Sequence, residues 1–317
     1  MLSKANNILV TGGAGFIGSH LAEHLVEKGH SVTVLDNLST GRMENLSSII
    51  SEIEFVKGSF GDRELARKLL RDADVVFHNA AVVGVKRTIE DPWSVLETDN
   101  YMNHMFFQEV INSGVKKLVF ASSSEVYGEP AKVPMDEEQP LNCRTPYQVS
   151  KKMAEVYCQV MTEKYGVDTC SLRYFNIYGP KQASNAYGFV TSIFLNRAIN
   201  LQPLVIFGDG SQTRDFTFVE DAVQANILAA GKRTKAATYN VGMGRETSIR
   251  ELAEKVINVT GKRLRIEHTE PLEGDIQRRF ADISKARREL GFKPGTSLES
   301  GLERTWGWFN NGVKGED

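Results

Sequence analysis

A tyrosine and a lysine stand four residues apart, at Tyr147 and Lys151, in a segment whose pattern predicts the start of a helix. That spacing places the phenol and the ammonium on one helical face, where the cation favours the phenolate and makes it a general base. Upstream, the apolar run that ends at Ala121 is followed by the hydroxyls of Ser123 and Ser124. Because parallel sheets keep their ligand sites at the carboxyl ends of strands, we expect these hydroxyls to act together with the pair.

A glycine-rich turn follows the first apolar run. Residues 12–18 match the pattern GxxGxxG, and the same segment read from Gly13 matches GxGxxG. Such glycines let the backbone approach a pyrophosphate at the amino end of the following helix. Asp36 comes eighteen residues after Gly18, where a carboxylate accepts hydrogen bonds from a ribose and repels a 2'-phosphate. The sequence therefore predicts NAD, and not NADP, as the cofactor.

Short apolar runs alternate with amphipathic stretches through the first half of the chain, which predicts a parallel sheet with helices on both faces. We expect an α/β fold in which residues 1–175 form a Rossmann-type, doubly wound NAD-binding domain that carries the catalytic side chains. Residues 176–317 have shorter, glycine-punctuated elements, and we expect mainly a smaller α/β substrate-binding domain, with some segments returning to the first. The expected strands are 7–10, 31–35, 74–77, 117–121 and 169–173, and the expected helices are 17–27, 93–111, 147–165 and 297–309.

The composition excludes several functional classes. The 317 residues carry a net charge of -2, so the basic footprint of a nucleic-acid-binding protein is absent. No segment has the apolar length of a membrane span, and we expect no signal peptide. The 3 cysteines lack disulfide-framework and zinc-ligand spacing, which favours a cytoplasmic location. His20 and His24 share a helix face without a third ligand, so we expect no metal site.

The glycine turn, Ser123 after its strand, and the pair Tyr147 and Lys151 resemble the extended short-chain dehydrogenase/reductase superfamily. Within it the chain is similar to the NAD-dependent nucleotide-sugar epimerases and dehydratases, most of all to the UDP-glucose 4-epimerases. The similarity spans nearly the whole chain, including residues 173–180, 208–216 and 274–278. It implies an enzyme in which C4 of a nucleotide sugar passes a hydride to NAD+, Tyr147 takes the hydroxyl proton, and Ser123 hydrogen-bonds the same oxygen.

The resemblance also implies which residues hold the substrate and the cofactor. Asn176 would contact the sugar or its phosphate, together with Ser124. Arg214 and Arg278 would neutralise the pyrophosphate, with Arg279 able to replace Arg278. The implied NAD contacts are Gly12, Gly15, Phe16, Ile17, Gly18, Asp36, Asn37, Ser39, Thr40, Gly41, Ser59, Ala80, Ala81, Asn100, Tyr147, Lys151 and Tyr174.

Glu125 leaves the reaction open. In a 4-epimerase the transient 4-keto sugar turns within the pocket and receives the hydride on its other face. In a 4,6-dehydratase a carboxylate removes the C5 proton and water leaves from C6. Residues 123–125 resemble the hydroxyl, proton donor and glutamate of sugar dehydratases and of nucleotide-sugar decarboxylases, but residues 147–152 lack the arginine of the decarboxylases.

The segment from Asp36 to Gly41 and the remainder of the chain are more similar to 4-epimerases of the glucose/galactose type. We therefore expect a 4-epimerase acting on a UDP-sugar. A 4,6-dehydratase that uses Glu125 as its base is the first alternative. A catalytically silent NAD-binding regulator is the second, because a fold alone does not guarantee an activity. The expected helices 93–111 and 147–165 could pair across a two-fold axis, as in many relatives, so we also expect a homodimer.

Overall fold

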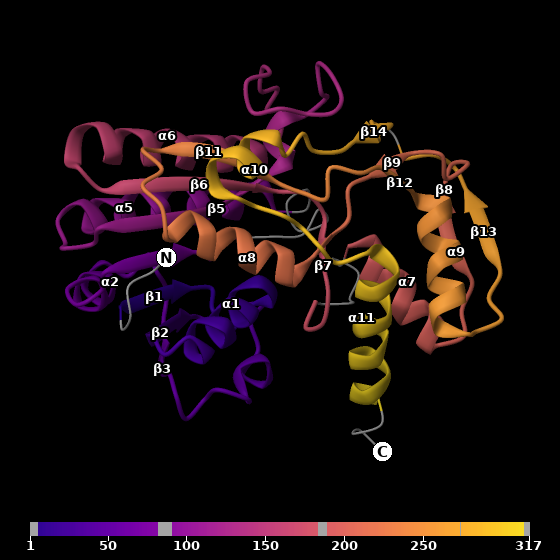
Figure 1. Ribbon diagram of the computed structural model, residues 1–317, viewed down its shortest axis with the longest axis horizontal. Coiled ribbons are helices and arrows are strands. Elements are labelled where there is room, and N and C mark those ends of the chain that lie inside the picture. Colours follow the sequence, from indigo (N-terminus) through magenta and orange to yellow (C-terminus); the bar gives the residue numbers. More distant parts are fainter. Residues whose placement is uncertain (1–5, 82–90, 183–188, 273, 314–317) are drawn as a thin grey trace.

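The computed structural model describes residues 6–81, 91–182, 189–272 and 274–313, and its centre is a seven-stranded parallel sheet (Figure 1). The strand order is β11-β6-β5-β4-β1-β2-β3, so the order reverses between β1 and β4. Such a switch point opens a ligand crevice at the carboxyl ends of the strands. The predicted doubly wound Rossmann fold is confirmed. The strands are β1 (Asn7–Thr11), β2 (Ser31–Asp36), β3 (Glu54–Lys57), β4 (Val75–His78), β5 (Lys117–Ser123), β6 (Asp168–Tyr174) and β11 (Ala237–Val241).

Helices cover both faces of this sheet, and most of its strands are apolar because both of their faces are buried. Ile8 and Val10 share a core with α1 (Phe16–Glu27) and α8 (Val219–Ala230). Leu9 points to the opposite face, as alternation along a strand requires. Its core is closed by α2 (Arg63–Leu70), α5 (Asn103–Ile111) and α6 (Pro146–Tyr165).

The expected helix over residues 93–111 is helical throughout but not uniformly α-helical. It consists of α4 (Pro92–Leu96), a π-helical turn labelled η2 (Glu97–Met102), and α5. Short π-helical turns inside helices are frequent at functional sites. This one carries Asp99 and Asn100, of which Asp99 is buried.

The second half of the chain adds short strands and helices beside the sheet, with α7, α9 and α11 grouped away from it (Figure 1). α11 covers most of the expected helix 297–309, and its Leu302 and Phe309 are buried. The strand β11 also comes from this half and forms one edge of the central sheet. The domain boundary at residue 175 stays a prediction. The remaining elements are η1 (Met43–Leu46), η3 (Ser124–Tyr127), β7 (Ile177–Tyr178), α7 (Val190–Ile199), β8 (Leu204–Phe207), β9 (Thr213–Arg214), β10 (Thr217–Phe218), β12 (Thr247–Ser248), α9 (Ile249–Thr260), β13 (Ile266–Thr269), β14 (Arg278–Arg279), α10 (Ser284–Leu290) and α11 (Leu298–Val313).

None of the described helices is both long enough and apolar enough to cross a bilayer.

Candidate active site

The glycine turn between β1 and α1 is shaped by close backbone contacts. Gly12 has a φ of +67°, and a Cβ atom there would lie 2.8 Å from the backbone nitrogen of Ala80. A Cβ atom on Gly18 would lie 2.2 Å from the Gly12 carbonyl oxygen, so this glycine lets α1 pack against the turn. A Cβ atom on Gly15, at the amino end of α1, would have only that same carbonyl oxygen nearby. The turn therefore allows a pyrophosphate to approach the amino end of α1 closely.

Asp36 ends β2 beside this turn and is buried. Its carboxylate accepts hydrogen bonds from the backbone N–H groups of Ala14 (3.0 Å) and Leu38 (2.8 Å). Each oxygen keeps a lone pair for a ribose hydroxyl. A Cβ atom on Gly41 would lie 2.8 Å from an Asp36 carboxylate oxygen, so Gly41 leaves room around the acid.

Asn79 is a polar residue of this crevice that the sequence reasoning missed. It follows β4, and neither its amide nitrogen nor its amide oxygen has a hydrogen-bond partner among the described residues. The buried Oδ1 of Asn100, on η2, is likewise without one in the described part of the chain. Buried amides of this kind are costly unless a ligand or water pairs them. The glycine turn, Asp36 and these amides fit a dinucleotide.

The other expected NAD contacts lie near the carboxyl ends of the strands. Ser59 follows β3, and its hydroxyl accepts a hydrogen bond from the Gly61 N–H (3.1 Å). Tyr174 ends β6, and its hydroxyl accepts a hydrogen bond from the Asn226 amide (2.7 Å). The residues that complete this set lie in the first turn of α1, directly after β2, or just after β4: Phe16, Ile17, Asn37, Ser39, Thr40, Ala80 and Ala81.

The expected catalytic pair, Tyr147 and Lys151, is positioned by the amino end of α6. Thr145 caps that end, and its backbone N–H is bound in return by the Gln148 side chain. Tyr147 thus lies in the first turn, with the Lys151 ammonium 5.6 Å from the centre of its ring. Lys151 is buried and donates a hydrogen bond to the Ala121 carbonyl oxygen of β5 (2.9 Å).

Electrostatics at this pair are dominated by burial. Burial raises the pKa of Tyr147 above its ordinary value, the carboxylate of Asp99 raises it further, and a hydrogen bond with the Ser123 side chain acts in the opposite direction. Burial lowers the pKa of Lys151, against which the charges of Asp99 and Glu155 act. For Tyr147 to act as a base, a second cation besides the Lys151 ammonium must lie near its phenol and lower its pKa. The sequence reasoning singled out Asn100 and missed Asp99, one residue earlier.

A buried ion pair between Glu155 and Arg173 lies beside the end of β5. Glu155, one helical turn after Lys151, accepts a hydrogen bond from the Ser122 hydroxyl (2.7 Å). Both of its oxygens accept from the Arg173 guanidinium, each at 2.8 Å. Since Ser122 directly precedes Ser123, this network holds the end of β5 that carries the expected catalytic hydroxyl.

The arginines that we expect to contact the pyrophosphate lie on two different faces of the small sheet formed by β12, β9 and β14. In the pairing of β14 with β9, Arg279 stands opposite Arg214 and Arg278 opposite Thr213, and registered residues share a face. Arg278 is mostly exposed and forms two hydrogen bonds with the Glu246 carboxylate (2.9 and 2.7 Å). Arg279 is buried, and its Nε has no partner among the described residues. The geometry thus favours Arg279 over Arg278 as a partner of Arg214.

Glu125 lies beside these two arginines and forms an ion pair with Arg279. Arg214 forms its own ion pair, with Asp275. Burial lowers the pKa of Arg214, and Glu125 and Arg279 also influence it, in opposite directions. Ser124, between Ser123 and Glu125, is buried. Two guanidinium groups, each paired with one carboxylate, therefore lie near the segment that carries the expected catalytic hydroxyls.

Asn176 follows β6 and has a φ of +34°. Its amide nitrogen donates a hydrogen bond to the Asp215 carbonyl oxygen (3.1 Å), directly after Arg214. The expected sugar contact is thus tied to the segment that carries an expected pyrophosphate contact.

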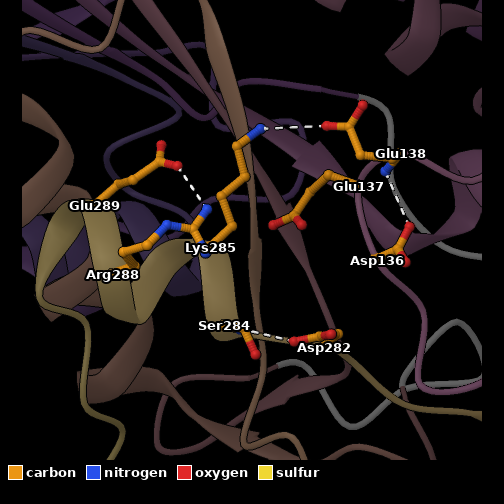
Figure 2. Close-up of a pocket in the computed structure, with 8 residues that line it drawn as sticks. All are labelled: Asp136, Glu137, Glu138, Asp282, Ser284, Lys285, Arg288 and Glu289. Carbon is orange, nitrogen blue, oxygen red and sulfur yellow. Dashed lines mark hydrogen bonds and ion pairs between the residues drawn. The ribbon is translucent and has the colours of Figure 1, made fainter.

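A hollow of about 340 Å³ lies elsewhere, between α10 and the loop at residues 136–138 (Figure 2). Five carboxylates and two cations line it, so it repels a pyrophosphate. The lining residues are Asp136, Glu137, Glu138, Asp282, Ser284, Lys285, Arg288 and Glu289. Across the described ranges, no group of three or more His, Cys, Asp or Glu side chains could hold a metal ion, and His20 instead bonds the Pro180 carbonyl oxygen (3.0 Å).

Known proteins resemble the chain over nearly its full length. Residues 9–305 match the family described as GDP-mannose 4,6 dehydratase. A putative UDP-glucose 4-epimerase of Methanocaldococcus jannaschii is 39% identical over 311 residues, which cover 96% of this chain and 98% of the relative. The chain belongs to the NAD-dependent nucleotide-sugar epimerase and dehydratase family. The predicted membership of the extended short-chain dehydrogenases is confirmed.

Other members of this family differ in their reactions. A UDP-N-acetyl-alpha-D-glucosaminuronate decarboxylase of Bacillus cytotoxicus is 36% identical over 313 residues, which cover 95% of this chain and 97% of the relative. The structure of a UDP-glucose 4-epimerase of Thermus thermophilus, in complex with NAD, superposes with a TM-score of 0.88 and 34% identity, covering 96% of this chain and 99% of that one. The family therefore fixes nucleotide-sugar chemistry but not one reaction.

Proposed function

We propose that the protein is an NAD-dependent 4-epimerase of UDP-sugars, of the UDP-glucose and UDP-galactose type. The observation that carries this proposal is the joint placement of Ser123, Tyr147 and Lys151 beside two arginines, Arg214 and Arg279. NAD, when bound, would supply the acceptor and donor of the hydride at C4 of the sugar. The glycine turn and Asp36 would hold its pyrophosphate and adenosine ribose.

The protein's own residues would bind the sugar and move its proton. Arg214 and Arg279 would hold the pyrophosphate, since a guanidinium fork matches its oxygens. Ser123 would hydrogen-bond the C4 hydroxyl, and Tyr147 would take the proton from that oxygen and return it. Lys151, held by the Ala121 carbonyl oxygen, would favour the phenolate form of Tyr147.

The ion pair of Glu125 favours the epimerase over the dehydratase. A dehydratase needs a carboxylate that is free to remove the C5 proton, and the Glu125 carboxylate is engaged by Arg279. It also needs a proton donor for the leaving water. Ser124 offers only a hydroxyl there, which is a weak general acid at neutral pH.

Product analysis tests the proposal. The protein is incubated with UDP-glucose, UDP-galactose, GDP-mannose, dTDP-glucose or UDP-N-acetylglucosaminuronate, and the products are identified by NMR. We expect interconversion of UDP-glucose and UDP-galactose, and its loss in Tyr147→Phe. A 4-keto-6-deoxy product without a C4 epimer would establish the dehydratase instead, and loss of the C6 carboxylate as carbon dioxide would establish a decarboxylase. NAD binding without turnover of any sugar would favour the regulator.

We also propose a homodimer. The face of α6 that carries Val149, Val156 and Val160 is exposed, although these residues are apolar. Trp93 on α4 and Tyr101 on η2 are 75% and 62% exposed, and both α4 and η2 pack against α6. Apolar side chains gathered on neighbouring helical segments support a self-complementary interface between two copies.

A further inference from the structure

We propose that Asp215 is a positioning residue that sets the separation of Arg214 and Arg279. This inference rests on the proposed function, in which the two guanidinium groups hold the pyrophosphate of the substrate. Asp215 is fully buried, and its carboxylate contacts the protein's own backbone and the Thr217 hydroxyl.

The carboxylate joins segments that are far apart in the sequence. One oxygen accepts a hydrogen bond from the Met243 N–H (2.7 Å), and the other accepts from the N–H groups of Gly244 (2.9 Å) and Ala281 (3.2 Å). Met243 and Gly244 follow β11, whereas Ala281 follows β14. A Cβ atom on Gly242 would lie 2.7 Å from an Asp215 carboxylate oxygen, so a glycine is needed for this close approach.

Asp215 and its partner Ala281 both stand close to the two arginines in the chain, so these hydrogen bonds affect where the arginines lie. Arg214 directly precedes it, and Arg279 lies two residues before its partner Ala281. The ladder between β9 and β14 has only two registered pairs, which gives it little stability of its own. Through its hydrogen bond with the Ala281 N–H, the Asp215 carboxylate links β9 and β14 just after the two arginines. Through its carbonyl oxygen, Asp215 also holds Asn176 (3.1 Å).

A neutral side chain of the same shape cannot replace this group. Both carboxylate oxygens accept from backbone N–H groups, and an asparagine would turn its NH2 group toward one set of donors. The protein keeps the acid although burial raises the pKa of Asp215 to about 6. An unpaired buried donor is costly, so we expect β9 and β14 to shift in an asparagine variant.

Asp168 provides a matched control. It also accepts hydrogen bonds from backbone N–H groups of a distant segment, those of Thr234 (3.1 Å) and Lys235 (2.7 Å). It stands at the first residue of β6, at the opposite end of that strand from Tyr174. Asp168→Asn therefore removes backbone contacts of this kind, together with an ion pair to the buried Lys117 ammonium (2.7 Å), away from the substrate crevice.

The experiment compares Asp215→Asn, Asp168→Asn and the unchanged protein with NAD bound. It measures the Kd of UDP by calorimetry, the KM and kcat for the UDP-sugar, and Tm. For Asp215→Asn we expect Kd and KM to rise about tenfold or more, with kcat changed less than about threefold, because misplacement of binding groups by about 1 Å weakens their contacts severely. Asp168→Asn should lower Tm while leaving Kd and KM unchanged.

Unchanged UDP affinity in a folded Asp215→Asn variant would overturn the positioning role, and so would an equal rise of Kd in Asp168→Asn. Should Asp215→Asn fail to fold, Gly242→Ala presses on the same carboxylate and should raise Kd in the same direction; a folded Gly242→Ala variant with unchanged Kd overturns the role. Failure of the unchanged protein to bind UDP would instead overturn the proposed function, and the positioning role with it.

Discussion

The neighbouring residues Arg278 and Arg279 allow the substrate contact to be tested with two substitutions of the same kind. In the pairing of β14 with β9, they face opposite sides. The Arg279 side chain is 8% exposed and the Arg278 side chain 57%. Arg279→Gln and Arg278→Gln each remove one positive charge, but only the first removes it from the face shared with Arg214.

The expected effects on KM differ at least about fivefold. A hydrogen bond to a charged partner contributes about 1.5–3 kcal/mol, so losing one bond between Arg279 and the pyrophosphate should raise KM about 10- to 150-fold. Arg278→Gln removes only an exposed ion pair with Glu246, which solvent screens. The KM of Arg278→Gln should stay within about twofold of the unchanged value.

The assay is a steady-state measurement of C4 epimerisation of UDP-galactose, coupled to the detection of UDP-glucose, together with the Kd of UDP. Arg279→Lys serves as a further control, because it keeps the charge and loses the fork, and should fall between the other two. A larger rise of KM in Arg278→Gln than in Arg279→Gln would refute the assignment of the faces.

Three further predictions concern Glu125, the buried His78 and the proposed dimer interface on α6. Glu125→Gln should retain at least about a third of the epimerase kcat, because the carboxylate is paired with Arg279 and takes no proton; a loss of more than about 100-fold, measured on UDP-galactose, would show that Glu125 is a base. Burial lowers the pKa of His78 to about 4 from 6.5, so its neutral form contributes stability that is fully present above pH 6.5 and lost as the pH falls toward 4. Urea unfolding at about pH 7 and pH 4 should show about 3 kcal/mol more acid destabilisation in the unchanged protein than in His78→Gln, and equal losses in the two would contradict this. Val160→Glu places a charge on the exposed face of α6 and should convert a dimer into monomers in sedimentation at micromolar concentration, whereas a surviving dimer would place the interface elsewhere.

The parts of the fold that the sequence predicts well are those decided by local pattern. The apolar runs give β1, β2, β4, β5 and β6 to within a few residues, because strands buried on both faces are continuously apolar. That Tyr147 and Lys151 share a helical face follows from their spacing alone. The strand β3 was not predicted because its segment Glu54–Lys57 begins and ends with a charged residue.

The unpredicted parts depend on contacts between distant segments. Glu125 meets Arg279 across 154 positions, and the partners of Asp215 are backbone groups that carry no sequence signal. In a strand of two residues, a shift of one position exchanges the faces, so the sequence could not decide between Arg278 and Arg279. Asn79 did have a signal, because it is a polar residue directly after an apolar strand.

The strand β11 has a consequence for synthesis of the protein. It lies beside β6 at the edge of the central sheet, yet β6 ends at residue 174 and β11 begins only at residue 237. Until β11 has left the ribosome, the edge of β6 that pairs with β11 in the folded protein has no neighbour. Unpaired strand edges favour association with other chains. Nascent chains that stall before β11 has emerged from the ribosome should therefore depend on chaperones more than chains in which β11 has emerged.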